Sequence, residues 1–134
     1  MKRPKPSPYH LQAKEWLKFA DYDLKVAQDN LKLGHYSYVC QLSQQAAEKY
    51  LKAFLVYHGR EPKRTHILRE LVSDCAKIKQ ELQSLMKWAK ELEQYYIPTR
   101  YPVGPFGVYG KHEATQAIES AQTIISILQK HLKI

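Results

Sequence analysis

A guanidinium beside an aromatic ring is the first pair of side chains here with the chemistry to hold a ligand. Arg100 and Tyr101 are adjacent in the segment TRYP, residues 99–102. An arginine offers a planar fork of N–H donors that matches phosphate oxygens, and a tyrosine ring can stack on a nucleobase. The alternative is structural, with Arg100 pairing with Glu48 or another carboxylate to hold its loop in place. Both interpretations stay open at the level of sequence.

Three polar residues, Gln45, Glu48 and Lys52, form a second candidate group. Spacings of three and four place them on one ridge of a helix. One interpretation is a solvated strip in which Glu48 and Lys52 pair, an interaction worth roughly 0.3–0.5 kcal/mol. The other is a polar floor to a cleft beneath the TRYP segment.

His66 is the third candidate, because an imidazole can donate to phosphate or act as a general base near neutral pH. It follows Thr65, whose hydroxyl is predicted to cap a helix that begins there, so His66 would lie in the first helical turn. In that position the imidazole could instead satisfy a nearby backbone or side-chain group.

Amphipathic helices must position these side chains. Apolar residues recur every three or four positions over 11–33, and Gly34 directly after this segment is predicted to end the helix in a left-handed conformation. Over 36–58 the apolar residues cover about half of the helix circumference. A helix with so broad an apolar surface is buried on more than one side, so 36–58 is predicted to be the central helix. A third stripe follows Thr65, with a break near Lys77–Glu81 before the next.

The final helix is predicted at about 112–132, and no segment alternates with period two for long enough to form a strand. We therefore predict an all-α fold, an up-down bundle of four to five helices in one domain over 11–134, preceded by a basic, proline-rich tail at 1–10. Residues 95–110 hold three prolines and three glycines, yet five aromatics and a single charge. Disordered linkers rarely have this composition, so the loop is predicted to pack against a surface.

The overall composition excludes some classes of protein. The chain has 134 residues and a net charge of +8, which favours an anionic partner such as RNA, a nucleotide or an acidic protein. No apolar run is long enough for a membrane span and no signal peptide is recognised, so the cytoplasm is the expected location. Cys40 and Cys75 lack metal-site spacing and are predicted to be small buried residues. Neither a metal nor a cofactor is predicted.

Three segments in order, QQAAEKYLKAFL at 44–55, KRTH at 63–66 and TRYP at 99–102, resemble those of HEPN domains. The similarity covers nearly the whole chain after the tail, and it is to small prokaryotic HEPN proteins often encoded beside a minimal nucleotidyltransferase. The resemblance implies a helical bundle that forms a homodimer and works on nucleotides or RNA. It also implies the nucleotidyltransferase as a partner, in a toxin–antitoxin-like pair.

The sequence departs from the HEPN ribonuclease motif, in which an arginine is followed, after a short interval, by a histidine at the entry to a late helix. Arg100 stands where that arginine is expected, but no histidine follows at the family spacing, and His112 is too distant. Arg60 and His66 have the spacing but lie after the second helix, which we interpret as coincidence. A non-catalytic binding module is favoured, with a metal-independent endoribonuclease as the alternative. The candidate nucleotide- or anion-binding residues are Arg100, Tyr101, Lys52, Glu48, Gln45 and His66.

Overall fold

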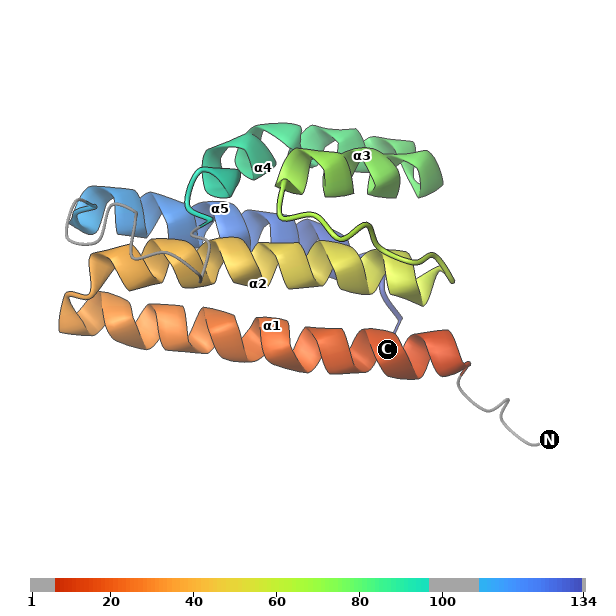
Figure 1. Cartoon of the computed structure of the whole chain (residues 1–134), viewed down its shortest axis with the longest axis horizontal. Coiled ribbons are helices and arrows are strands. Elements are labelled where there is room, and N and C mark those ends of the chain that lie inside the picture. The colour runs from red at the N-terminus through yellow and green to blue at the C-terminus, as the bar shows by residue number, and fades with distance from the viewer. Residues whose placement is uncertain (1–6, 97–108, 134) are drawn as a thin grey trace.

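The computed structural model describes residues 7–96 and 109–133 of the chain. Its elements follow in the order α1 (Pro8–Leu33), α2 (Tyr36–Tyr57), α3 (Leu68–Ile78), a short 3-10 helix η1 (Gln80–Leu85), α4 (Met86–Glu93) and α5 (Lys111–Gln129). α1 and α2 form a hairpin, α5 lies beside α2, and α3 to α4 cover the side of this pair away from α1 (Figure 1). The predicted all-helical bundle is confirmed. No helix in the described ranges is both long and apolar enough to span a membrane.

α1 begins three residues before its predicted start at residue 11. The hydroxyl of Ser7 accepts a hydrogen bond from the His10 N–H at 3.1 Å, and Pro8 occupies the first helical position, where a missing N–H costs nothing. The helix ends at Gly34, whose φ of 84° lies in the left-handed region that glycine tolerates best. The glycine stop predicted from the sequence is therefore confirmed.

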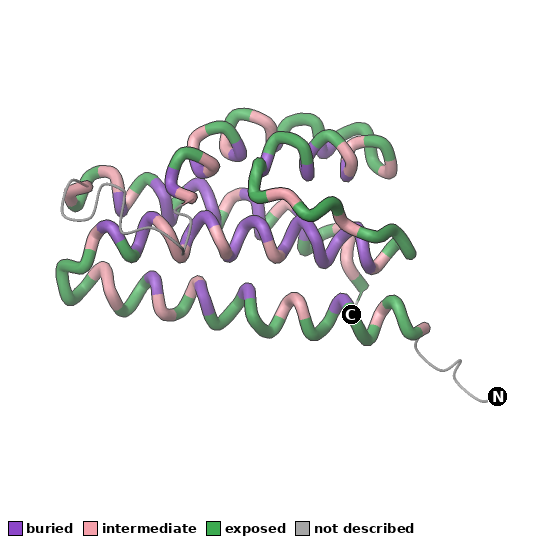
Figure 2. The backbone as a smooth tube through the Cα atoms, in the orientation of Figure 1, coloured by how far each residue is buried: buried purple, intermediate pink, exposed green. Residues whose placement is uncertain are grey.

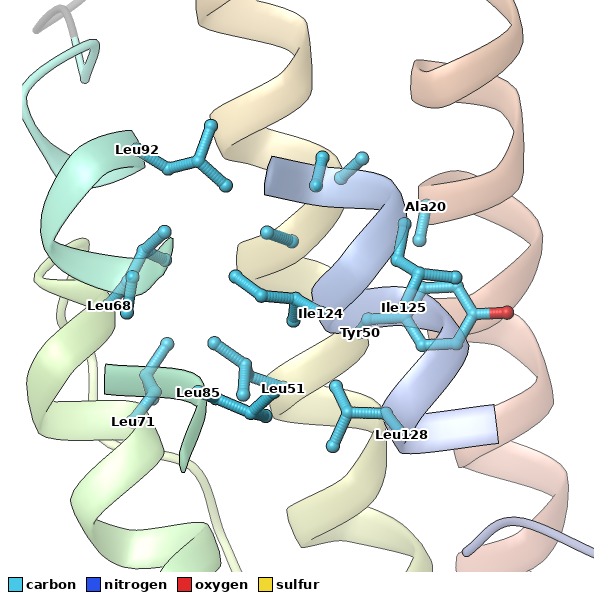
Figure 3. Close-up of a cluster of buried hydrophobic side chains, with 14 of the residues drawn as sticks. Ala20, Tyr50, Leu51, Leu68, Leu71, Leu85, Leu92, Ile124, Ile125 and Leu128 are labelled. Atoms are coloured by element: carbon cyan, nitrogen blue, oxygen red, sulfur yellow. The ribbon is translucent and has the colours of Figure 1, made fainter. Parts of the chain in front are cut away.

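α2 is the central helix, as its broad apolar surface predicted. Fifteen of its 22 residues are buried, against four of 26 in α1, and Figure 2 shows this contrast along the two helices. Leucine and isoleucine side chains from α3, η1, α4 and α5 converge on α2 (Figure 3), namely Leu68, Leu71, Leu85, Leu92, Ile124 and Leu128 around Leu51.

Both cysteines lie in this core and neither forms a disulfide. Burial raises the pKa of the Cys40 thiol to about 12, and burial likewise raises the pKa of Cys75. Because the thiolate is the reactive form, both groups are chemically quiet at neutral pH. They are the small buried residues that the sequence predicted.

The helix that follows α2 starts later than predicted. Thr65 does not cap it, because α3 begins at Leu68. The Thr65 hydroxyl instead accepts from the Ile67 N–H at 3.1 Å and donates to Glu70 Oε2 at 2.7 Å, which fixes the turn before the helix. His66 therefore lies in the coil before α3 rather than in its first turn.

The break between the third and fourth helical stripes falls where it was predicted. α3 ends at Ile78, Lys79 takes an extended conformation with φ −132° and ψ 102°, and η1 begins at Gln80. The change of direction allows η1 and α4 to fold back along α3 (Figure 1). As a result, the end of α4 lies beside the coil that contains His66.

Candidate functional site

A buried carboxylate, Glu48, lies at the centre of the candidate site. Its Oε2 pairs with the Lys52 Nζ at 3.1 Å, and its Oε1 accepts a hydrogen bond from the Gln44 Nε2 at 3.2 Å. The Nδ1 of His66 lies 2.9 Å from the same Oε1. Gln44, Glu48 and Lys52 are four residues apart on α2, so one helical ridge delivers all three to the coil before α3.

The solvated-strip interpretation does not hold for this ridge. Glu48 and Lys52 are each 8% exposed, and Gln44 is fully buried. A buried ion pair is stable only when each charge keeps its partner and its hydrogen bonds, and here both carboxylate oxygens are occupied. The ridge is therefore a tightly constrained support beneath His66.

Two neighbouring glutamines have different roles. Gln44 bonds to Glu48 and also donates to the backbone carbonyl of His66 at 3.4 Å, which ties the coil to α2. It was not among the predicted site residues, although its spacing of four from Glu48 was a signal that could have included it. Gln45, which was predicted, is half-buried and has no hydrogen bond with the ridge among the described residues.

The imidazole of His66 is held in one orientation. Because a carboxylate only accepts hydrogen bonds, Nδ1 carries the hydrogen in its contact with Glu48, and Nε2 is the nitrogen on the other side of the ring. The ring also stacks on Tyr96, with centroids 4.0 Å apart and planes 11° from parallel. The His66 side chain is still 48% exposed, so a fixed imidazole is presented at the surface.

A groove of about 500 Å³ opens beside this stacked pair. The coil before α3, the start of α3 and the end of α4 meet here (Figure 1). Glu93 accepts hydrogen bonds from both the backbone N–H and the side chain of Arg69, which joins the start of α3 to the end of α4. The groove is lined by Arg64, Thr65, His66, Ile67, Arg69, Glu93 and Tyr96.

The residues that line this groove carry a net positive charge, from Arg64 and Arg69 against Glu93. Lys52 neutralises Glu48, and Arg69 neutralises Glu93. Arg64 lines the groove without an ion pair to any carboxylate in the described part of the chain. The arrangement can therefore offer a guanidinium, a fixed imidazole and a tyrosine ring to an anionic, aromatic ligand.

The structure brings together only part of the predicted set. Glu48, Lys52 and His66 form one contact network, whereas Arg100 and Tyr101 lie outside the described residues. Of the two alternative motif residues, Arg60 does not line the groove, and His112 is exposed in the first turn of α5. Arg64 and Tyr96 were not among the predicted site residues, although Arg64 stands in the KRTH segment, residues 63–66, on which the family resemblance rests.

The fold is a helical bundle built on a long hairpin, and its central helix carries a buried polar ridge. Residues 13–132 match the profile of the HEPN domain, so the chain belongs to the HEPN domain family. A Methanocaldococcus jannaschii protein named "Putative toxin MJ1304" is 30% identical over 135 residues, covering 90% of this chain and 88% of the relative.

Solved structures share the fold over nearly their whole length. The crystal structure of TT1696 from Thermus thermophilus has a TM-score of 0.80 at 35% identity, covering 90% of this chain and 98% of that one. The structure of ST0689, described as an archaeal HEPN homologue, has a TM-score of 0.75 at 29% identity, covering 99% and 100% of the two chains. The family resemblance stated from the sequence is thereby confirmed.

Proposed function

We propose that this HEPN protein is a non-catalytic binding module that holds the phosphate of a nucleotide or RNA in the groove beside His66 and Tyr96. The charge balance of the groove carries this proposal. Glu48 and Glu93 each have a cation, whereas Arg64 has no carboxylate partner among the described residues. A phosphate would supply the missing negative charge, and a base could stack at the edge of the aromatic pair.

Arg100 and Tyr101 are part of the proposal as contacts from the segment that follows Tyr96. Arg100 follows Tyr96 by four residues in the sequence, which is why the proposal includes it. The buried pair of Glu48 and Lys52 has a supporting role in this account, because it fixes the imidazole of His66 rather than facing the ligand. Gln45, half-buried on α2, stays a candidate contact.

We further propose that the protein acts as a homodimer and that a minimal nucleotidyltransferase is its partner, in a toxin–antitoxin-like pair. The name of the Methanocaldococcus jannaschii relative, "Putative toxin MJ1304", supports a role of this kind. Co-purification of the chain with the product of an adjacent nucleotidyltransferase gene would test the partnership directly.

Replacing Arg64 with alanine is expected to weaken the binding of a short single-stranded RNA by about 1–3 kcal/mol, the range for losing a charge-assisted hydrogen bond. The slope of log affinity against log salt should also become shallower, because fewer counterions are released. Fluorescence anisotropy with a labelled RNA at two salt concentrations measures both effects. Arg60→Ala is the matched control, since Arg60 lies in the same coil but does not line the groove.

The same titration with Arg100→Ala and Arg100→Lys tests the contact proposed for the loop. Arg100→Ala should weaken binding while Arg100→Lys restores only part of it, because a point charge replaces the fork. Full affinity in a folded Arg64→Ala, Arg100→Ala double variant would overturn the assignment of the groove as a phosphate site.

A ribonuclease is the second candidate function, because the contact of His66 with Glu48 resembles the way a general base is oriented. We expect the purified protein to cleave RNA poorly, since no histidine follows Arg100 at the family spacing. Incubation of labelled RNA with the protein in EDTA, followed by gel electrophoresis, checks this expectation. Rapid cleavage that is lost in the His66→Ala variant would show that the protein is a ribonuclease and not a non-catalytic binding module.

A further inference from the structure

Large hydrophobic side chains are exposed mainly on α1. Five of the seven such residues in the described ranges belong to this helix, namely Tyr9, Leu11, Phe19, Tyr22 and Leu33. Single exposed apolar residues are ordinary on a protein surface, whereas a contiguous exposed apolar patch marks an interaction site. We name the α1 face after three of these exposed residues, which lie within about 80° of the helix circumference at 100° per residue: Leu11, Phe19 and Tyr22. The half-buried Trp16 lies at the inner edge of this face.

The α1 face has a groove, and two lysines of α2 contact its aromatic rings. A groove of about 380 Å³ lies on it, lined by Gln12, Glu15, Trp16 and Phe19. The Nζ of Lys49 lies 5.8 Å from the centre of the Phe19 ring, and the Nζ of Lys52 lies 5.8 Å from that of Trp16. These cation–π contacts from α2 hold the rings in place before any partner arrives, which reduces the entropy lost on binding.

The charge of α1 indicates what the face can accept. The whole chain has a net charge of +8, yet α1 contains four lysines and four carboxylates, with the two signs interleaved. A polyanion such as RNA would be drawn to the basic surfaces and not to this one. Two copies of a strongly basic chain repel each other, so their contact is least opposed where the surface is neutral and carries both signs.

We propose that the α1 face is the contact between two copies of this chain, with α1 packed against α1 of the second copy about a two-fold axis. The inference rests on the homodimer of the proposed function and adds the surface that forms it. α1 lies at the edge of the bundle, where its outer side is not covered by another helix (Figure 1). A helix of 26 residues is about 39 Å long, which suits an interface of about 800 Å² per partner.

A charge placed on the face should separate the two copies. Light scattering at micromolar concentration is expected to give about twice the 15.7 kDa chain mass for the wild type. For a Phe19→Glu, Tyr22→Glu double variant it should give the mass of one chain. In a dimer the two new carboxylates of each chain would be buried against the same carboxylates of the other chain. Ile67→Glu is the control, since Ile67 is 47% exposed but lies in the coil before α3. Circular dichroism establishes that each variant is folded.

A cross-link gives a second readout that does not depend on disrupting the dimer. Cys40 and Cys75 are buried, so a Phe19→Cys variant presents one reactive thiol. Mild oxidation should join two chains through residue 19, and an Ile67→Cys variant should stay uncoupled. The α1 face is rejected as the interface if the wild type is dimeric, the double variant is also dimeric and Phe19→Cys does not cross-link. That result would leave the homodimer itself unaffected. A monomeric wild type would reject both, and RNA binding by that monomer would leave the proposed phosphate groove unaffected.

Discussion

Lys52→Met is expected to destabilise the protein by about 3–5 kcal/mol, the range for removing one partner of a buried ion pair. The replacement keeps most of the side-chain volume but leaves the Glu48 carboxylate, which is 8% exposed, without its cation. Gln44 and His66 still contact Glu48, yet neither brings a permanent positive charge. Chemical denaturation measures the loss as a fall in the denaturant midpoint at an unchanged slope.

A second variant separates the charge effect from a packing effect. In the Glu48→Leu, Lys52→Met double variant no buried charge is left unpaired, so most of the stability should return. If Lys52→Met is as stable as the wild type at pH 8, the ridge is not the tight support that we infer.

Leu51→Ala is expected to cost about 2–5 kcal/mol, because it empties a fully buried position on the central helix. Side chains from α3, η1 and α5 pack around Leu51 (Figure 3), so no single element can move in to fill the space. For a domain of 134 residues the melting temperature should fall by about 7–18 °C. Leu33→Ala, the same substitution at a residue that is 69% exposed, should change stability by less than about 0.5 kcal/mol.

The helices could be predicted from the sequence because apolar periodicity and glycine stops are local signals. Gly34 ends α1 where expected, and the break after Ile78 fell inside the predicted interval. Thr65 was misjudged because its hydroxyl can cap a helix or close a turn equally well, and the choice depends on Glu70, which accepts its hydrogen bond. Helix ends are set by such competing contacts, which periodicity does not report.

The candidate site was only partly predictable. The spacing of Glu48 and Lys52 placed them on one ridge, but spacing does not say whether a ridge faces water or the coil of another segment. His66 reaches Glu48 only because the chain between α2 and α3 runs back along α2, and Tyr96 reaches His66 only because α4 folds back along α3. These are long-range contacts, and they turn a polar strip into a buried support.

The central claim is that the groove beside His66 and Tyr96 holds a phosphate-bearing ligand. NMR of the histidine and tyrosine ring resonances during titration with a short single-stranded RNA tests it most directly. We expect saturable shifts of the His66 and Tyr96 rings, while the exposed His35 and His112 rings stay unchanged. RNA binding that shifts the rings of His35 or His112 and leaves those of His66 and Tyr96 unmoved would contradict the account.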